Sequence, residues 1–200
     1  MLRNELTDGD PGDPPARVAA ALAGGDLGIA DLTARQLGEF VGKTSSVLYR
    51  RYGSLDGFLH EVAQAGFLAL AGRLESVADA GGLADVAAAF VDFGLTKPAL
   101  YYVMFEHRFD WDALRSAGTL SGPMPGLELW GRIISRLEAT GSTAPATDAR
   151  LLYAGLHGLV SLASGGRANL GELATSDYDI AIASARALAE RLIPDATSRL

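Results

Sequence analysis

The sequence predicts an all-α protein, in which a small N-terminal helical bundle is joined by one long helix to a larger C-terminal helical domain. Two observations lead to this prediction. Apolar residues recur every three or four positions in most segments, which is the spacing of an amphipathic helix, and Gly or Pro separates these segments. About nine helices, no strand and no internal repeat are expected over the 200 residues.

Composition favours a globular chain and excludes several chemistries. Hydrophobic residues make up 48% and charged residues 20% of the sequence. There is no cysteine, so a disulfide framework, a thiolate nucleophile and a cysteine-based zinc site are ruled out. The three histidines, His60, His107 and His157, are too widely spaced for a paired metal motif. We therefore expect neither a metal nor a cofactor.

The first 13 residues are rich in Asp, Gly and Pro and have no apolar run typical of a signal peptide. They are expected to form a disordered acidic lead. The most apolar later run, residues 154–163, contains Gly and His and is far shorter than the ~20 residues that a membrane helix needs. The sequence therefore predicts a cytoplasmic protein without a membrane partner.

The first helix follows Pro14 and Pro15, because proline is favoured in the first turn, and ends at Gly24 and Gly25. A turn over residues 26–31 comes next, and Ile29 is expected to anchor it to the core.

The next two helices are short and lie close together in the sequence. Thr33 is a candidate N-cap, with Gln36 three residues later as in a capping box. Gly42 is placed to end this helix in a left-handed conformation. Thr44 is expected to cap a second helix over residues 45–51. A connection of about four residues is typical of a helix-turn-helix.

The polar side of the second helix carries Ser45, Ser46, Tyr49 and Arg50. Between Phe40 and Leu55 the chain has three positive charges and no acidic residue, although its net charge is −7. A local cationic surface on an acidic chain favours binding to a polyanion at this place. From the residues alone the alternative stays open that this is an ordinary two-helix turn with surface arginines.

Residues 32–59 resemble the N-terminal DNA-binding domain of the TetR/AcrR transcriptional regulators, and the close resemblance covers roughly residues 16–65. The matching positions are Leu32, Thr33, Leu37, Gly42, Leu48, Tyr49, Arg50, Tyr52, Ser54, Phe58 and Leu59. The resemblance implies a three-helix DNA-binding domain over residues 14–60 and an effector-binding and dimerisation domain over residues 61–200. It also implies that helix 45–51 enters the major groove of double-stranded DNA.

The resemblance and the local charge together give a set of candidate DNA-binding residues. They are Thr33, Lys43, Thr44, Ser45, Ser46, Tyr49, Arg50, Arg51 and Ser54. The sequence departs from the family pattern at Lys43, at Ser45 and at Leu55, where a phosphate-contacting Lys is typical. Without that Lys we expect a modest dependence of DNA affinity on salt, since each neutralised phosphate adds about −0.9 to the slope.

Beyond this stretch the periodicity predicts further helices, separated by loops. They are expected at residues 54–78, 83–95, 98–108, 126–139, 148–164 and 178–193. Thr147 is expected to cap the helix that starts at residue 148, and residues 109–125 are expected to be turn-rich without a helix.

The helices around 149–164 and 178–193 would present apolar surface in a monomer, and their small residues would let helices approach closely. We expect them to form a four-helix interface in a homodimer, which the family resemblance also implies. Two-fold symmetry would then match a pseudo-palindromic operator. The alternative is that both helices are internal core.

Aromatic and thioether side chains are frequent in the middle of the chain. A set of them is the candidate lining of a pocket for an apolar or aromatic effector: Tyr101, Met104, Phe105, Trp130, Tyr153 and His157. His157 and Gly158 resemble a His-Gly element of one class of C-terminal domains in the family. The alternative is that these side chains are packed core.

An enzymatic function is not expected. No G-x-S-x-G motif occurs, and the Gly pairs lie where helices end rather than after a strand. Asp110 with Asp112, or Glu106 with His107, could act as acid–base pairs, but loop carboxylates are usually only solvated. The predicted function is a DNA-binding repressor released by a small-molecule effector. The alternative is an all-α ligand-binding or protein-interaction module with a weakened DNA-binding end.

Overall fold

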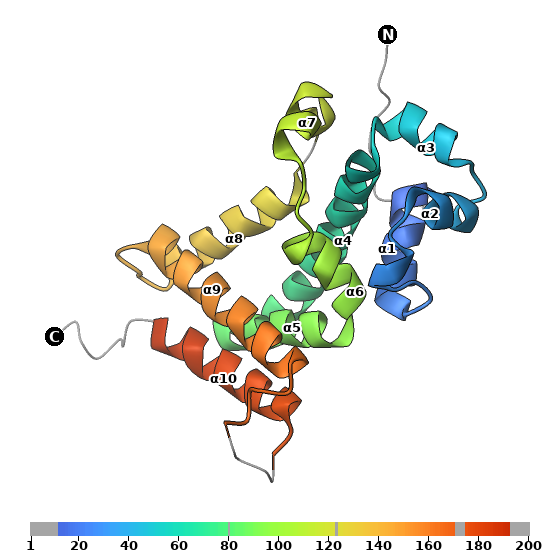
Figure 1. Cartoon of the computed structure of the whole chain (residues 1–200). Coiled ribbons are helices and arrows are strands. Elements are labelled where there is room, and N and C mark those ends of the chain that lie inside the picture. Colours follow the sequence, from blue (N-terminus) through green and yellow to red (C-terminus); the bar gives the residue numbers. More distant parts are fainter. Residues whose placement is uncertain (1–11, 80, 123, 171–174, 193–200) are drawn as a thin grey trace, which may run out of the picture. The chain divides into compact units, whose positions relative to one another are not determined.

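The computed structural model describes residues 12–79, 81–122, 124–170 and 175–192 (Figure 1). These residues form ten α-helices, two short 3₁₀-helices and one π-helix, and no strand occurs among them. The all-α prediction is confirmed. Most of the acidic lead predicted at residues 1–13 lies outside the described residues.

The α-helices follow the predicted order, with one addition. Their bounds are α1 Pro14–Gly24, α2 Ala34–Phe40, α3 Ser45–Tyr52, α4 Leu55–Ala78, α5 Leu83–Thr96, α6 Pro98–Tyr101, α7 Trp111–Ser116, α8 Pro125–Ala139, α9 Pro145–Ser164 and α10 Asp177–Leu192. The 3₁₀-helices are η1 (Ile29–Asp31) and η3 (Thr119–Ser121), and the π-helix is η2 (Tyr102–Glu106).

The chain divides into two compact units. Unit 1 contains residues 1–69 and 97–124, and unit 2 contains residues 70–96 and 125–200. Helix α4 begins in unit 1 and ends in unit 2. The functional boundary expected between residues 60 and 61 stays a prediction.

The core of unit 1 is formed by apolar side chains from α1 to α4 that are almost fully buried: Val18, Leu22, Leu37, Leu48, Phe58, Leu59 and Val62. Helix α1 ends as predicted, because Gly25 has a φ of +85° and its N–H donates to the Ala21 carbonyl. The expected anchor of the following turn is wrong. Ile29 is 48% exposed, and Leu27 is buried instead.

Residues 98–121 differ from the prediction of one helix followed by a helix-free loop. Helix α6 is short and continues as the π-helix η2. Helix α7 then begins after Asp110, whose carboxylate accepts the Ala113 N–H at 2.9 Å. A carboxylate in this position satisfies an N–H that has no partner within the helix, so Asp110 starts a helix where none was predicted.

Unit 2 is built around α5, which is buried along most of its length. Helix α10 packs against α5 and α9, which lie beside it in Figure 1, and its buried side chains are Ala181, Ala185 and Ala189. Thr147 does not cap α9, because the helix already begins at Pro145. Among the described residues, none of the helices combines the length and apolar character that crossing a membrane requires.

Candidate nucleic-acid interface and ligand-binding site

Helix α2 begins at the cap predicted from the sequence, but only half of the capping box is formed. The Thr33 hydroxyl accepts the Gln36 N–H at 3.2 Å and donates to Gln36 Oε1 at 2.7 Å. The Thr33 N–H donates instead to the Asp31 carbonyl at 2.7 Å, and Gln36 Nε2 donates to Asp31 Oδ1 at 3.1 Å. In a complete capping box the Gln36 side chain would accept the Thr33 N–H. Here Asp31 accepts that N–H and also binds the Gln36 side chain.

The turn between α2 and α3 depends on two glycines. Gly42 has a φ of +70°, as predicted for the end of α2. Gly38 is buried and was not singled out in the sequence. A Cβ atom on Gly38 would lie 2.8 Å from the Lys43 carbonyl oxygen, so the turn can pass this close only over a glycine. The sequence held one sign of this close approach, because Gly38 lies four residues before the predicted helix end at Gly42.

Helix α3 is held against α2 by its first residue. Thr44 occupies the N-cap position as predicted, but its side chain makes no capping hydrogen bond. The Ser45 hydroxyl donates to the Ala34 carbonyl in α2 at 3.3 Å. Leu48 is 3% exposed and fixes the inner side of α3.

The outer side of α3 is exposed. Tyr49 is 47% exposed, and Ser46, Arg50 and Arg51 also lie at the surface. Thr33, Lys43 and Thr44 are exposed as well, whereas Ser45 is half-buried. The structure therefore brings most of the predicted DNA-binding residues to the surface of the helix-turn-helix.

The candidate cations differ in their surroundings. Arg51 pairs with Asp13 at 3.2 Å. Within the described part of the chain, neither Lys43 nor Arg50 has an ion-pair or side-chain hydrogen-bond partner. Arg35 in α2 is likewise exposed, and it follows Ala34, the residue that Ser45 contacts. Arg35 precedes the acid-free stretch between Phe40 and Leu55, so the local charge pattern did not predict its place beside this surface.

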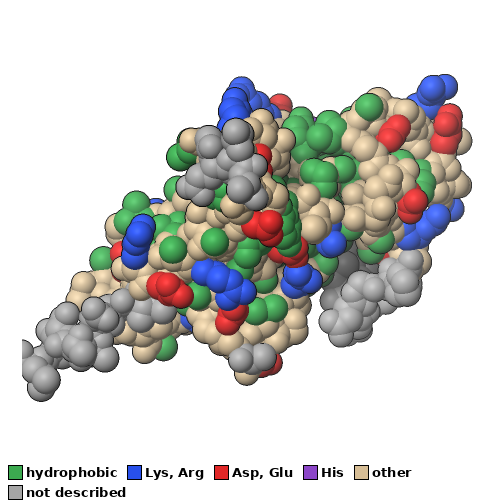
Figure 2. All heavy atoms as spheres, turned by 90° about the horizontal axis from the view of Figure 1, so that it is seen from below, with side chains coloured by type: hydrophobic (Ala, Val, Ile, Leu, Met, Phe, Trp, Pro, Cys, Tyr) green, Lys and Arg blue, Asp and Glu red, His purple; other side chains and the backbone are tan. Residues whose placement is uncertain are grey.

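On the face shown in Figure 2, basic and acidic side chains alternate with hydrophobic ones and form no single continuous basic surface. This agrees with a net charge of −7.

Tyr52 and Ser54 connect α3 to α4. The Tyr52 ring packs edge-on against Phe58 with centroids 4.9 Å apart. Its hydroxyl is buried without a hydrogen-bond partner among the described residues, and burial raises the pKa of Tyr52 to about 12. Ser54 caps α4 as predicted, since its hydroxyl accepts the Gly57 N–H at 2.9 Å.

The first turn of α4 is tied to the segment before α7. The Asp56 carboxylate accepts the Asp110 N–H at 3.0 Å, and its other oxygen lies 3.2 Å from His107 Nε2. A carboxylate in the first turn is also favoured by the helix dipole. Leu55, the position where a Lys is typical of the family, is half-buried.

The six residues predicted to line an effector pocket fall into two groups, one in each unit. In unit 1, Tyr101 and Met104 are buried, and the rings of Tyr101 and Phe105 are 4.6 Å apart. In unit 2, the centroid of the Tyr153 ring lies 6.0 Å from that of the Trp130 ring. The Tyr153 ring also stacks on the His157 ring, with centroids 5.9 Å apart. Burial raises the pKa of the Tyr153 hydroxyl, although part of its side chain stays exposed. The joint pocket stays a prediction.

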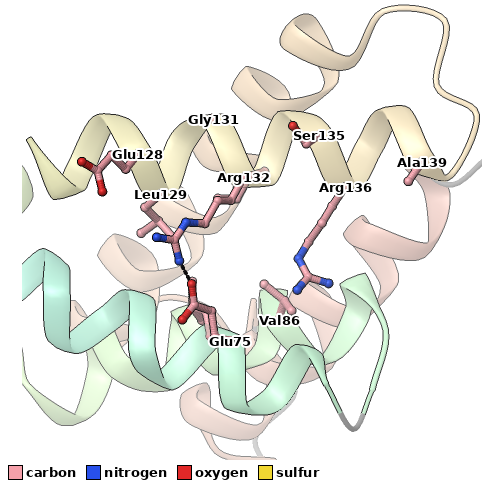
Figure 3. A pocket seen from close by; sticks show the side chains of 11 residues that line it. Glu75, Val86, Glu128, Leu129, Gly131, Arg132, Ser135, Arg136 and Ala139 are labelled. Carbon is pink, nitrogen blue, oxygen red and sulfur yellow. Dashed lines mark ion pairs between the residues drawn. The ribbon is translucent and has the colours of Figure 1, made fainter.

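Unit 2 contains a pocket of about 640 Å³ bordered by α4, α5 and α8 (Figure 3). None of the six predicted residues lines it. Its lining includes apolar and charged side chains: Leu74, Val86, Leu129, Ile133, Glu75, Glu128, Arg132 and Arg136. The sequence held one sign of this pocket: two arginines, Arg132 and Arg136, lie four residues apart and so on one face of α8.

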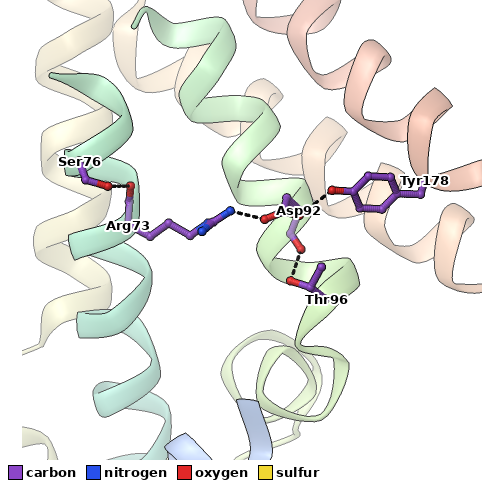
Figure 4. A network of polar contacts seen from close by, with 5 residues as sticks. All are labelled: Arg73, Ser76, Asp92, Thr96 and Tyr178. Carbon is purple, nitrogen blue, oxygen red and sulfur yellow. Dashed lines mark hydrogen bonds and ion pairs between the residues drawn. The ribbon is translucent and has the colours of Figure 1, made fainter. Parts of the chain in front are cut away.

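A second pocket of about 530 Å³ is bordered by α4, α5 and α10. Asp92 lines this pocket, forms an ion pair with Arg73 and accepts the Tyr178 hydroxyl at 2.6 Å (Figure 4). This hydrogen bond raises the pKa of Tyr178. Arg186 pairs with Asp85 and lowers the pKa of that carboxyl. The charges in this pocket are thus already paired within the protein.

An all-α chain that opens with a helix-turn-helix and continues in a larger helical unit has the architecture of a helix-turn-helix regulator. Residues 83–192 match the family model of the tetracycline repressor-like C-terminal domain. This match covers more than half of the chain, and the protein belongs to the tetracycline repressor-like (TetR) family of regulators.

A solved structure shares the fold. It is described as a protein with unknown function from Rhodococcus sp. RHA1, with 21% sequence identity and a TM-score of 0.62. The match covers 96% of this chain and 100% of the other chain. No functionally curated protein matches this sequence.

Proposed function

We propose that the protein is a cytoplasmic, homodimeric transcriptional repressor that binds a pseudo-palindromic operator and is released by a small-molecule effector. The observation that carries the DNA-binding part is the outer face of α3. Ser46, Tyr49 and Arg50 are exposed there, while the Ser45 hydroxyl and the Leu48 side chain hold the helix against the rest of unit 1. A helix fixed on one side and open on the other can enter a major groove.

The dimer is proposed to form through the outer sides of α9 and α10. On the inner side of α10, the side chains of Ala181, Ala185 and Ala189 are buried against the rest of unit 2 and are not available to a second copy. On the outer sides, Leu151 and Leu162 are 57% and 43% exposed, and the space around Gly158 is open. Apolar surface of this kind supports association with a second copy.

Release from DNA is proposed to follow a population shift. The effector would bind better to a conformation in which the two recognition helices have the wrong separation, so that DNA affinity falls. Helix α4 is the proposed lever because it begins in unit 1 and ends in unit 2.

The test uses fluorescence anisotropy with labelled DNA from the promoter region of the protein's own gene and its neighbours. Arg50→Ala and Tyr49→Ala should each weaken binding by at least about tenfold, since neither variant can make the proposed interactions with bases and phosphates at that position. Arg167→Ala removes an exposed charge from the loop after α9 and serves as the matched control. Circular dichroism should show unchanged helicity in all three variants.

If no fragment from this neighbourhood binds even at low salt, the proposal fails. The protein would then be better described by the alternative function, an all-α ligand-binding or protein-interaction module. The pairing of Arg51 with Asp13 and the apolar residue Leu55 are the observations that favour this alternative.

A further inference from the structure

The pocket between α4, α5 and α8 has an apolar floor with charges at its rim. Leu74, Val86 and Leu129 are each less than 10% exposed and come from the three different helices. Its volume of about 640 Å³ lies within the range of roughly 300–1,000 Å³ that is usual for small-molecule sites. The floor therefore suits the apolar body of a small ligand.

The charges at the rim are unequally satisfied. Arg132 forms an ion pair with Glu75, drawn as a dashed line in Figure 3. Arg136 has no ion-pair or side-chain hydrogen-bond partner within the described part of the chain. Its side chain extends from α8 into the pocket, so that the guanidinium lies beside Val86 (Figure 3).

A guanidinium in this position has a defined chemical preference. It keeps its charge at any physiological pH, and its planar set of donors matches the two oxygens of a carboxylate. Because Arg132 is engaged by Glu75, Arg136 is the cation that is available. The other carboxylate of the lining, Glu128, lies eight residues before Arg136 on α8 and at the opposite end of the pocket in Figure 3. The pocket at Asp92 offers no such group, since Arg73 and Arg186 are both paired.

We infer that the pocket between α4, α5 and α8 binds an amphipathic monocarboxylate, with the carboxylate on Arg136 and the apolar body over Leu74, Val86 and Leu129. This inference names the ligand class for the effector part of the proposed function and rests on it.

The test measures binding of sodium decanoate to the full chain without DNA and below micelle-forming concentrations. The protein has two tryptophans, so Trp111→Phe leaves Trp130 as the reporter. Trp130 immediately precedes Gly131, which lines the pocket. Decanoate should change the Trp130 emission saturably, and decanol should bind at least about tenfold more weakly because it cannot pair with a cation.

Arg136→Gln, in the same background, should weaken decanoate binding by about tenfold or more and leave decanol binding unchanged. Arg167→Gln is the matched control and should bind decanoate like the parent. Arg136→Glu should remove decanoate binding and favour decyltrimethylammonium. Arg136 is exposed, so these variants should fold, which far-ultraviolet circular dichroism checks.

The inference is overturned if decanoate does not bind, if decanol binds equally well, or if Arg136→Gln binds decanoate like the parent. Operator binding is measured separately without decanoate. Intact operator binding with no decanoate binding would overturn the inference alone, whereas absent operator binding would overturn the proposed function and leave ligand binding measurable.

Discussion

The Lys43 N–H donates a hydrogen bond of 2.8 Å to the Gly38 carbonyl, which closes the turn between α2 and α3 over the backbone of Gly38. A Cβ atom on Gly38 would lie 2.8 Å from the Lys43 carbonyl oxygen, closer than side chains normally approach backbone oxygen. The angle between the two helices therefore depends on the absence of a side chain at residue 38.

Gly38→Ala is expected to destabilise the protein by about 1–3 kcal/mol, because the obstructing atom belongs to the backbone and cannot simply rotate away. Thermal unfolding followed by circular dichroism measures this loss. Gly72→Ala is the control: the space around Gly72 in α4 is open, and alanine there should be neutral or stabilising by up to ~1 kcal/mol. Equal stability of the two variants would contradict this account of the turn.

Local signals explain which elements the sequence could predict. Thr33 and Ser54 make the expected caps, and Gly25 and Gly42 take the left-handed conformations expected at helix ends. Each of these features depends on residues within four positions of one another. Helix α7 has such a signal in Asp110, but the Gly and Pro residues that follow it between residues 118 and 125 led to a turn-rich prediction for the whole of residues 109–125.

Features that depend on distant residues could not be predicted in the same way. Arg136 has no ion-pair partner within the described part of the chain, because Glu75 in α4 pairs with Arg132 and not with Arg136. The pairing of Arg51 with Asp13 joins residues 38 positions apart. Neither ion pair can be predicted from the spacing of residues in the sequence.

The ion pair between Arg51 and Asp13 leads to a prediction about DNA affinity. Arg51→Ala should weaken operator binding less than Arg50→Ala, because the charge of Arg51 is already partly neutralised within the protein. The slope of log affinity against log salt should change by about 1 for each phosphate that the variant no longer neutralises, and this change is expected for Arg50→Ala and Arg35→Ala. A slope that changes most in Arg51→Ala would argue against this order.

The proposed dimer predicts that charge on the outer side of α9 separates the two copies. Leu162→Glu should shift the protein from dimer to monomer in sedimentation velocity, since a carboxylate would be buried without a partner in the interface. Leu127→Glu, at a 63% exposed position on α8, should leave the dimer intact. If Leu162→Glu sediments like the parent, another surface would have to hold the dimer.

Monomeric Leu162→Glu should also lose operator affinity. A two-fold operator is bound by two recognition helices held about one turn of DNA apart. Without the dimer each half-site is bound independently, so the apparent affinity for the whole operator falls. Full affinity in a confirmed monomer would contradict the proposed mode of binding.

The buried hydroxyl of Tyr52 leads to a prediction about stability at high pH. The pKa of Tyr52 is about 12 in the folded protein, against 10.0 for an ordinary tyrosine, because burial disfavours the phenolate. The folded state thus retains the proton where the unfolded state releases it. The contribution of this group to stability is fully present below pH 10 and is lost as the pH rises from 10 through 12.

Tyr52→Phe removes the titrating group and a hydroxyl that has no hydrogen-bond partner among the described residues. The variant should be at least as stable as the parent at pH 7, because an unsatisfied buried polar atom is removed. Between pH 10 and 12 its stability should fall less steeply than that of the parent, as measured by urea unfolding at each pH. Parallel decline of the two proteins would mean that Tyr52 titrates as an exposed tyrosine does, and that its hydroxyl reaches water in the folded state.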